Sequence, residues 1–171
     1  MSSASFAEHK HQMRRVRERY DALGPGDRAV LRRCKTEDDL RLEGAYWRVV
    51  GDARDLERGI ATAVLLFPLA AQRTSERFSF GRYLRSHLKV DHDGTTLRVR
   101  RVIQSERDQL AHRLRGLIKL AEAGDGTPGI DWGVLGADLA RFGDHVRRNW
   151  TQDFFAPSYD GTTTIATTTT A

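Results

Sequence analysis

Apolar residues recur at three- and four-residue steps along most of the chain, which is the period of an amphipathic α-helix. Polar capping residues, glycines and prolines interrupt this pattern and divide it into separate helices. Because the helical period dominates, the predicted fold class is all-α. We expect helices over residues 5–23, 27–34, 36–50, 52–67, 79–88, 105–124 and 131–154.

Candidate N-caps mark the beginnings of several of these helices. Ser105 with Asp108 is expected to open one helix, and Asp131 is expected to cap the last one. A single apolar stripe then runs from Leu135 through Trp150. Residues 131–154 are therefore predicted to form one continuous helix.

The segment 88–103 fits two structures. Leu97-Arg98-Val99-Arg100 alternates apolar and charged residues, and Asp93-Gly94 suits a tight turn that would pair this run with Leu88-Lys89-Val90 as a β-hairpin. A lone two-stranded hairpin is marginal in water, however. The apolar residues between Leu97 and Ile103 also share one helical face. We expect a helix here, with the hairpin as the open alternative.

The helices are expected to form two small bundles. The polar stretch 72–79 is typical of a linker, so one helical bundle is predicted in residues 1–75 and another in residues 76–156. The Thr-rich end offers almost nothing to bury, so residues 157–171 are predicted to be a disordered tail. A chain of 171 residues is long enough to build a hydrophobic core without disulfides or metals.

Positive charge is concentrated in the middle of the chain. Twelve Lys or Arg residues and five Asp or Glu residues lie between Arg73 and Lys119, so this stretch carries +7 while the whole chain carries +5. The basic residues are 24 Arg and 4 Lys. Arg presents a planar fork of donors that matches phosphate, although a GC-rich genome would produce the same bias. Charge placed so unevenly indicates a polyanionic partner, most often nucleic acid.

The sequence carries no recognisable catalytic constellation. It has no phosphate-binding glycine loop, no nucleophile elbow, no paired CxxC and no HExxH motif. Asp91-His92-Asp93 holds three potential metal ligands, but adjacent residues diverge in direction and Gly94 follows, so a solvated turn is the better interpretation. Cys34 has basic neighbours but no obvious general base. We expect a protein that is not an enzyme and uses no metal or cofactor.

The chain also lacks the signals of secretion and of membrane insertion. Its single cysteine, Cys34, has no intramolecular disulfide partner. No stretch is typical of a signal peptide or of an 18-residue apolar span. A cytoplasmic protein without a membrane partner is the expectation.

Helical spacing places several basic side chains on shared faces. On the first helix, Arg14 and Arg17 follow Lys10 along one flank of the apolar stripe. Arg113 and Arg115 belong to the helix that follows Ser105. These residues are predicted to contact nucleic acid. The alternative is a simply solvated face, since carboxylates lie among them and neutralise part of the charge.

Motifs in four parts of the chain occur in an order and at a spacing that resemble one family. They are Gly26–Cys34 (GDRAVLRRC), Phe80–Leu84 (FGRYL), Leu97–Ile103 (LRVRRVI) and Asp131–Phe155, which begins DWGVL and ends VRRNWTQDFF. The likeness covers roughly residues 8–155, and the closing motif is its most specific element. On these motifs the chain resembles the CasB family, the small subunit of the type I-E CRISPR effector complex Cascade.

The resemblance implies a non-catalytic, all-helical subunit that associates as a pair within Cascade. Its implied partners are other Cascade protein subunits, crRNA, and single-stranded or target DNA. Such a subunit would hold nucleic-acid backbone and stabilise the R-loop in antiviral defence, because guide pairing reads the sequence. Helical spacing already predicts nucleic-acid contacts by Arg14, Arg17, Arg113 and Arg115. The resemblance adds seven predicted nucleic-acid-binding residues: Arg32, Arg33, Arg82, Arg98, Arg101, Arg147 and Arg148.

Two other functions remain open. A helix-turn-helix DNA-binding regulator would use the Gly24-Pro25-Gly26 turn, although the helix that follows is short for a major groove. A basic adaptor that binds an acidic protein would explain the charge but not RNA-dependent assembly. Co-purified short RNA with several protein subunits, sequence-specific duplex binding, or a protein partner alone would distinguish the three.

Overall fold

The computed structural model describes residues 3–73, 78–90, 92–124 and 129–156, with side chains from residue 5 onward. Within these residues the chain is helical, and the only β-type contact is an isolated parallel bridge between Gln72 and Ile130. The predicted all-α fold class is confirmed. The elements are α1 (Ser3–Asp21), α2 (Pro25–Arg33), α3 (Glu37–Arg41), α4 (Gly44–Val50), η1 (Arg54–Leu56), α5 (Glu57–Leu66), η2 (Phe67–Leu69), α6 (Phe80–His87), α7 (Asp93–Ile103), α8 (Arg107–Glu122), α9 (Trp132–Ala140) and α10 (Asp144–Phe155), where η marks a 3-10 turn.

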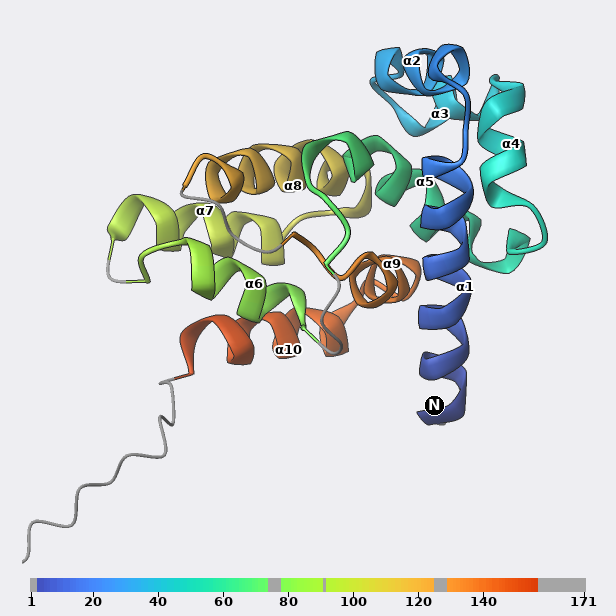
Figure 1. Ribbon diagram of the computed structural model, residues 1–171. Helices are drawn as coiled ribbons and strands as arrows, with labels where there is room; N and C mark the ends of the chain where they lie inside the picture. The colour runs from blue at the N-terminus through green and yellow to red at the C-terminus, as the bar shows by residue number, and fades with distance from the viewer. Residues whose placement is uncertain (1–2, 74–77, 91, 125–128, 157–171) are drawn as a thin grey trace, which may run out of the picture.

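Helix α9 is buried along almost its whole length, from Trp132 to Leu139. It packs against α1 and α5 and lies near the centre of the molecule in Figure 1. Gly59 on α5 permits this close approach, because a Cβ atom at that position would lie 2.5 Å from the backbone nitrogen of Ala140. Helix α9 therefore forms the middle of the core.

Helices α6, α7, α8 and α10 gather on the opposite side of α9 from α1 (Figure 1). The contact between α6 and α10 is close, because a Cβ atom at Gly81 would lie 2.6 Å from the carbonyl oxygen of Trp150. The buried rings of Phe80 and Trp150 meet there with centroids 4.9 Å apart. Aromatic packing thus fixes α10 against α6.

Segments from the two predicted bundles share one core. The amide of Arg73 donates to the carbonyl of Ile130 over 2.9 Å, and the amide of Ile130 donates to the carbonyl of Ala71 over 3.0 Å. Helix α9, from the second segment, packs on α1 and α5 of the first. The division into bundles at residues 75 and 76 stays a prediction, and the predicted tail lies outside the described residues.

Two of the predicted helices are broken in the structure. The segment 36–50 forms the separate helices α3 and α4, because the chain turns at Leu42. The prediction of one continuous helix over 131–154 is also wrong, since Arg141–Gly143 separates α9 from α10. Gly143 is extended and precedes the first turn of α10. The break lets α9 pack on α1 and α5 while α10 packs on α6.

The helix expected within the segment 88–103 is confirmed as α7, and the hairpin alternative is wrong. Val99, Val102 and Ile103 are buried, as a helical face requires, whereas Leu97 is half exposed. Tertiary packing of this apolar face against the core outweighs the local alternation of apolar and charged residues.

Local capping follows the sequence in some places and departs from it in another. Ser79 and Asp131 cap α6 and α9, because each side chain accepts a hydrogen bond from the amide three residues later. The predicted Ser105 cap of α8 is wrong. Its hydroxyl donates to the carbonyl of Arg101, in the last turn of α7, over 2.8 Å, while Glu106 precedes the first turn of α8.

Candidate nucleic-acid interface

Helices α7 and α8 form a groove with basic walls, which we name the basic groove. Its volume is about 460 Å³, and it is lined by Arg98 and Arg101 from α7 and by His112 and Arg113 from α8. No Asp or Glu is among the described residues that line it. Three of the predicted nucleic-acid-binding residues thus come together from two helices.

Arg98 and Arg101 form the α7 wall of the basic groove. Both are exposed and lie three residues apart, about one helical turn. Within the described part of the chain, neither side chain has an ion-pair or hydrogen-bond partner. Val99 and Val102 are buried on the same helix and fix its orientation. Both guanidinium groups are therefore held at the surface and free to meet an anion.

Arg113 links the two walls of the basic groove. Its Nη1 donates to the carbonyl of Arg101 over 2.8 Å, and its Nη2 donates to Gln109. Arg115 faces away from the groove, where its Nη2 donates to the carbonyl of Leu65 on α5 over 3.2 Å. Residues two apart on a helix point about 200° apart. Of the predicted pair on α8, only Arg113 belongs to the basic groove.

The two predicted arginines of α1 are engaged inside the fold. Arg17 is 9% exposed, and its Nη1 donates to the carbonyls of Phe67 and Ala70 over 3.2 and 3.3 Å. Arg14 forms an ion pair of 3.4 Å with the buried carboxylate of Asp131. Both side chains connect α1 to other elements of the core, and we leave them outside the candidate interface.

The arginines of α10 and α6 differ in how freely they can meet a ligand. Arg147 is half-buried and donates to the carbonyl of Ser105 over 2.9 Å. Arg148 is exposed, with no hydrogen bond or ion pair in the described part of the chain. Arg82 is also exposed and lies 3.9 Å from the carboxylate of Asp153. Of these three arginines, Arg148 and Arg82 are more accessible than Arg147.

Arg32 and Arg33 are exposed at the end of α2, an element separate from the basic groove. Cys34 follows them and is buried. Burial raises the pKa of the Cys34 thiol, and the carboxylates of Glu43 and Asp39 raise it further. The basic neighbours do not lower it, so this thiol has the character of a packed side chain and not of a nucleophile.

The sequence does not mark His112 as part of this surface. It immediately precedes Arg113 and is exposed on the α8 wall of the basic groove. His112 lines the basic groove because of the way α8 packs against α7, and no local sequence motif predicts that packing. The imidazole of His112 adds a hydrogen-bond donor beside the arginines.

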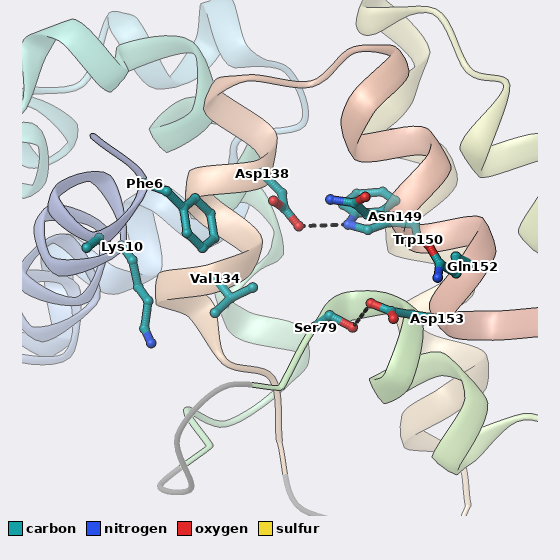
Figure 2. A pocket seen from close by; sticks show the side chains of 10 residues that line it. Phe6, Lys10, Ser79, Val134, Asp138, Asn149, Trp150, Gln152 and Asp153 are labelled. Carbon is teal, nitrogen blue, oxygen red and sulfur yellow. Dashed lines mark hydrogen bonds between the residues drawn. The ribbon is translucent and has the colours of Figure 1, made fainter. Parts of the chain in front are cut away.

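A second cavity, of about 570 Å³, lies among α1, α9, α10 and the start of α6 (Figure 2). Asp138 is 8% exposed and accepts a hydrogen bond of 2.8 Å from Nε1 of Trp150. Burial raises the pKa of Asp138 to about 6, against the opposing effects of Trp150 and Arg141. We name this cavity the Asp138 cleft; its lining includes Phe6, Lys10, Val134, Asp138, Trp150 and Asp153.

The described residues hold neither a cluster of metal ligands nor a membrane-spanning helix. No three His, Cys, Asp or Glu side chains among the described residues gather closely enough to hold a metal ion. Asp91, part of the sequence candidate for a metal, lies outside these residues. None of the described helices is both long enough and apolar enough to cross a membrane.

Comparison with known proteins assigns the chain to a family. The CRISPR-associated protein Cse2 family matches residues 27–155, which is more than half of the chain. The fold is similar to a chain in the crystal structure of E. coli Cascade bound to a PAM-containing dsDNA target, with a TM-score of 0.66 and 22% sequence identity over 81% of this chain and 91% of that chain. No curated protein matches significantly. The predicted resemblance is confirmed, and the chain belongs to the Cse2 (CasB) family of CRISPR-associated proteins.

Proposed function

We propose that the chain is the non-catalytic small subunit of a type I-E CRISPR RNA-guided surveillance complex. In this role it binds the backbone of crRNA and of the displaced or target DNA strand, and it stabilises the R-loop in antiviral defence. Membership of the Cse2 family supports a place in such a complex. The similar fold found in a DNA-bound Cascade structure supports other Cascade subunits and nucleic acid as partners. A second copy of the chain is a further proposed partner.

The basic groove is the observation that carries this proposal. Arg98, Arg101 and Arg113 line a cavity of about 460 Å³ in which no described carboxylate offsets their charge. Arginine contacts to phosphate position a nucleic acid without reading its bases. A subunit of a guide-directed complex needs this kind of contact, because base pairing with the guide supplies the specificity.

The test is the double variant Arg98→Ala/Arg101→Ala in the assembled complex. The fold should survive, because Arg113 binds the backbone carbonyl of Arg101 and not its side chain. Target binding should weaken equally for every target sequence. Each lost single-strand phosphate contact lowers the slope of log K against log salt by about 0.7, so the double variant should lower it by roughly 1.4.

The matched control is Arg54→Ala/Arg58→Ala, which removes the same charge from exposed positions in η1 and at the start of α5. This control should leave the salt slope unchanged. An unchanged slope for the Arg98 and Arg101 variant in a normally assembled complex would refute the role of the basic groove. Affinity purification tests membership itself, because short RNA of uniform length should co-purify with several other proteins. A protein partner without RNA would indicate an adaptor, and sequence-specific duplex binding by the free chain would indicate a regulator.

A further inference from the structure

We propose that the Asp138 cleft receives the side chain of a Lys or Arg from a neighbouring protein subunit. The inference rests on the proposed function, because it requires an assembly in which another protein lies against α1, α9 and α10. The proposed occupant of the cleft is positively charged, whereas the ligand proposed for the basic groove is negatively charged. The groove binds phosphate, and the cleft binds a protein cation.

The carboxylate of Asp138 makes no ion pair within the described part of the chain, although the charge of Arg141 nearby lowers its pKa. One of its oxygens accepts the hydrogen bond from Trp150, and the other lies on the side of the cleft where Phe6 stands (Figure 2). Arg141, three residues later, does not pair with it. The Nε atom of Arg141 donates to the carbonyl of Ala137, and its guanidinium lies over the Phe6 ring at 4.6 Å. A buried carboxylate with one satisfied oxygen is costly unless a cation compensates it.

A second carboxylate strengthens the preference of the cleft for a cation. Asp153 lines the same cavity and accepts a hydrogen bond from the hydroxyl of Ser79 (Figure 2). Arg82 lies 3.9 Å from Asp153, but its side chain is 64% exposed. Lys10 on α1 contributes the one ammonium group of the lining and makes no ion pair in the described part of the chain. Two carboxylates and one ammonium group thus line the cleft, and the guanidinium of Arg82 offsets part of the charge of Asp153 from outside the lining.

The walls of the cleft suit a long basic side chain better than a small ion. Phe6 and Val134 offer apolar surface beside the two carboxylates, as Figure 2 shows. Lys and Arg place an aliphatic stem along apolar surface while the charged head reaches a polar group. The aromatic ring of Phe6 already accepts one guanidinium group, that of Arg141. A phosphate group would instead meet the carboxylate of Asp138, so nucleic acid is a poor fit.

The test measures the affinity of this subunit for a complex assembled from the other subunits and guide RNA. Asp138→Asn removes the charge while keeping a carbonyl oxygen that can accept the hydrogen bond from Trp150. Removing one partner of a buried charge pair should weaken binding by about 30-fold or more. Asp144→Asn on α10 removes the same charge from a side chain that is 87% exposed and lies outside the cleft lining, so its binding should stay near wild type.

A photoreactive residue in place of Gln152, at the rim of the cleft, identifies the occupant. It should crosslink to a peptide of another protein chain that contains Lys or Arg. Crosslinks to RNA or DNA alone, or wild-type affinity of Asp138→Asn in a normally assembled complex, would overturn the inference. If the wild-type chain does not join any complex, the proposed function itself fails. Failure to assemble is thus distinguished from the failure of this inference, in which the complex assembles but no side chain of another protein enters the cleft.

Discussion

Replacing Asp138 by Asn should make the isolated protein more stable at neutral pH. The side chain of Asp138 is buried between α9 and α10, and burial raises its pKa from 3.8 to about 6. Between these two pH values the folded protein binds a proton that the unfolded chain has lost. The stability contributed by this group therefore falls as the pH rises from about 4 to about 6, and the loss is complete above that range. An amide carries no such penalty.

The expected gain follows from the size of the pKa change. At about 1.36 kcal/mol for each unit of pKa, the change from 3.8 to about 6 corresponds to about 3 kcal/mol at pH 7.5. At pH 4.5 the same two pKa values leave a difference of only about 1 kcal/mol, because the folded carboxyl is then protonated. The hydrogen bond from Trp150 is kept in the variant, since the amide oxygen accepts it in place of the carboxylate.

Urea unfolding followed by tryptophan fluorescence at several pH values measures this difference. The informative quantity is the difference in the free energy of unfolding between Asp138→Asn and wild type. The absolute stability of either protein also depends on Asp39 and Asp52, whose lowered pKa values make stability rise with pH instead of fall. The gap should widen from pH 4.5 to pH 7.5. A variant that is no more stable than wild type at pH 7.5, or a gap that does not change with pH, would show that Asp138 is not an uncompensated buried charge in the free protein.

The remaining predictions concern packing. Gly59→Ala should lower the free energy of unfolding by about 1–3 kcal/mol, because the added Cβ would overlap the backbone of Ala140. Gly116→Ala should raise the free energy of unfolding by about 0.5–1 kcal/mol, because no atom lies near the added Cβ at this helical position. Urea midpoints of the two variants should move in opposite directions, and a stable Gly59→Ala would contradict the α5–α9 packing. Arg17→Met should cost about 2–4 kcal/mol, because it leaves the buried carbonyls of Phe67 and Ala70 with fewer donors. If Arg17→Met keeps wild-type stability but loses affinity for nucleic acid, Arg17 belongs to the nucleic-acid interface and does not stabilise the core.

Local signals in the sequence were sufficient for much of the helical structure. The Thr36 capping box and the caps at Ser79 and Asp131 depend on groups three residues apart, so the sequence alone contains both partners. The break after α9 also has a local signal in the sequence. Gly143 is the N-cap of α10 and Asp144 lies in its first turn, and both residue types are common at helix starts. The apolar stripe continues across Gly143, however, and periodicity alone does not show that its two halves pack on different neighbours.

The contacts that decide the role of each arginine are distant in sequence. Arg17 donates to carbonyls 50 and 53 residues away, and Arg115 reaches a carbonyl 50 residues away. Helical spacing gives the direction in which a side chain leaves its own helix, but not the element that it meets. Of the four arginines chosen from spacing, only Arg113 lies in the basic groove. Arg98 and Arg101 follow from the resemblance to the family, which the helical period could not supply.

The break between α9 and α10 connects the fold to both proposed surfaces. One straight helix would carry Asp138 and Trp150 twelve residues and about 18 Å apart along its axis, yet the structure joins them by a hydrogen bond of 2.8 Å. The turn at Gly143 therefore creates the Asp138 cleft. A cation in the cleft binds the ionised form of Asp138, whose pKa in the free chain is about 6 with Arg141 and Asp153 nearby and Lys10 in the same cleft. Lowering the pH toward 5.5 therefore favours the unbound state of the cleft, but it leaves the arginines of the basic groove charged. Acidification should thus weaken the protein contact while the phosphate contacts persist, so the two surfaces can be separated in one complex.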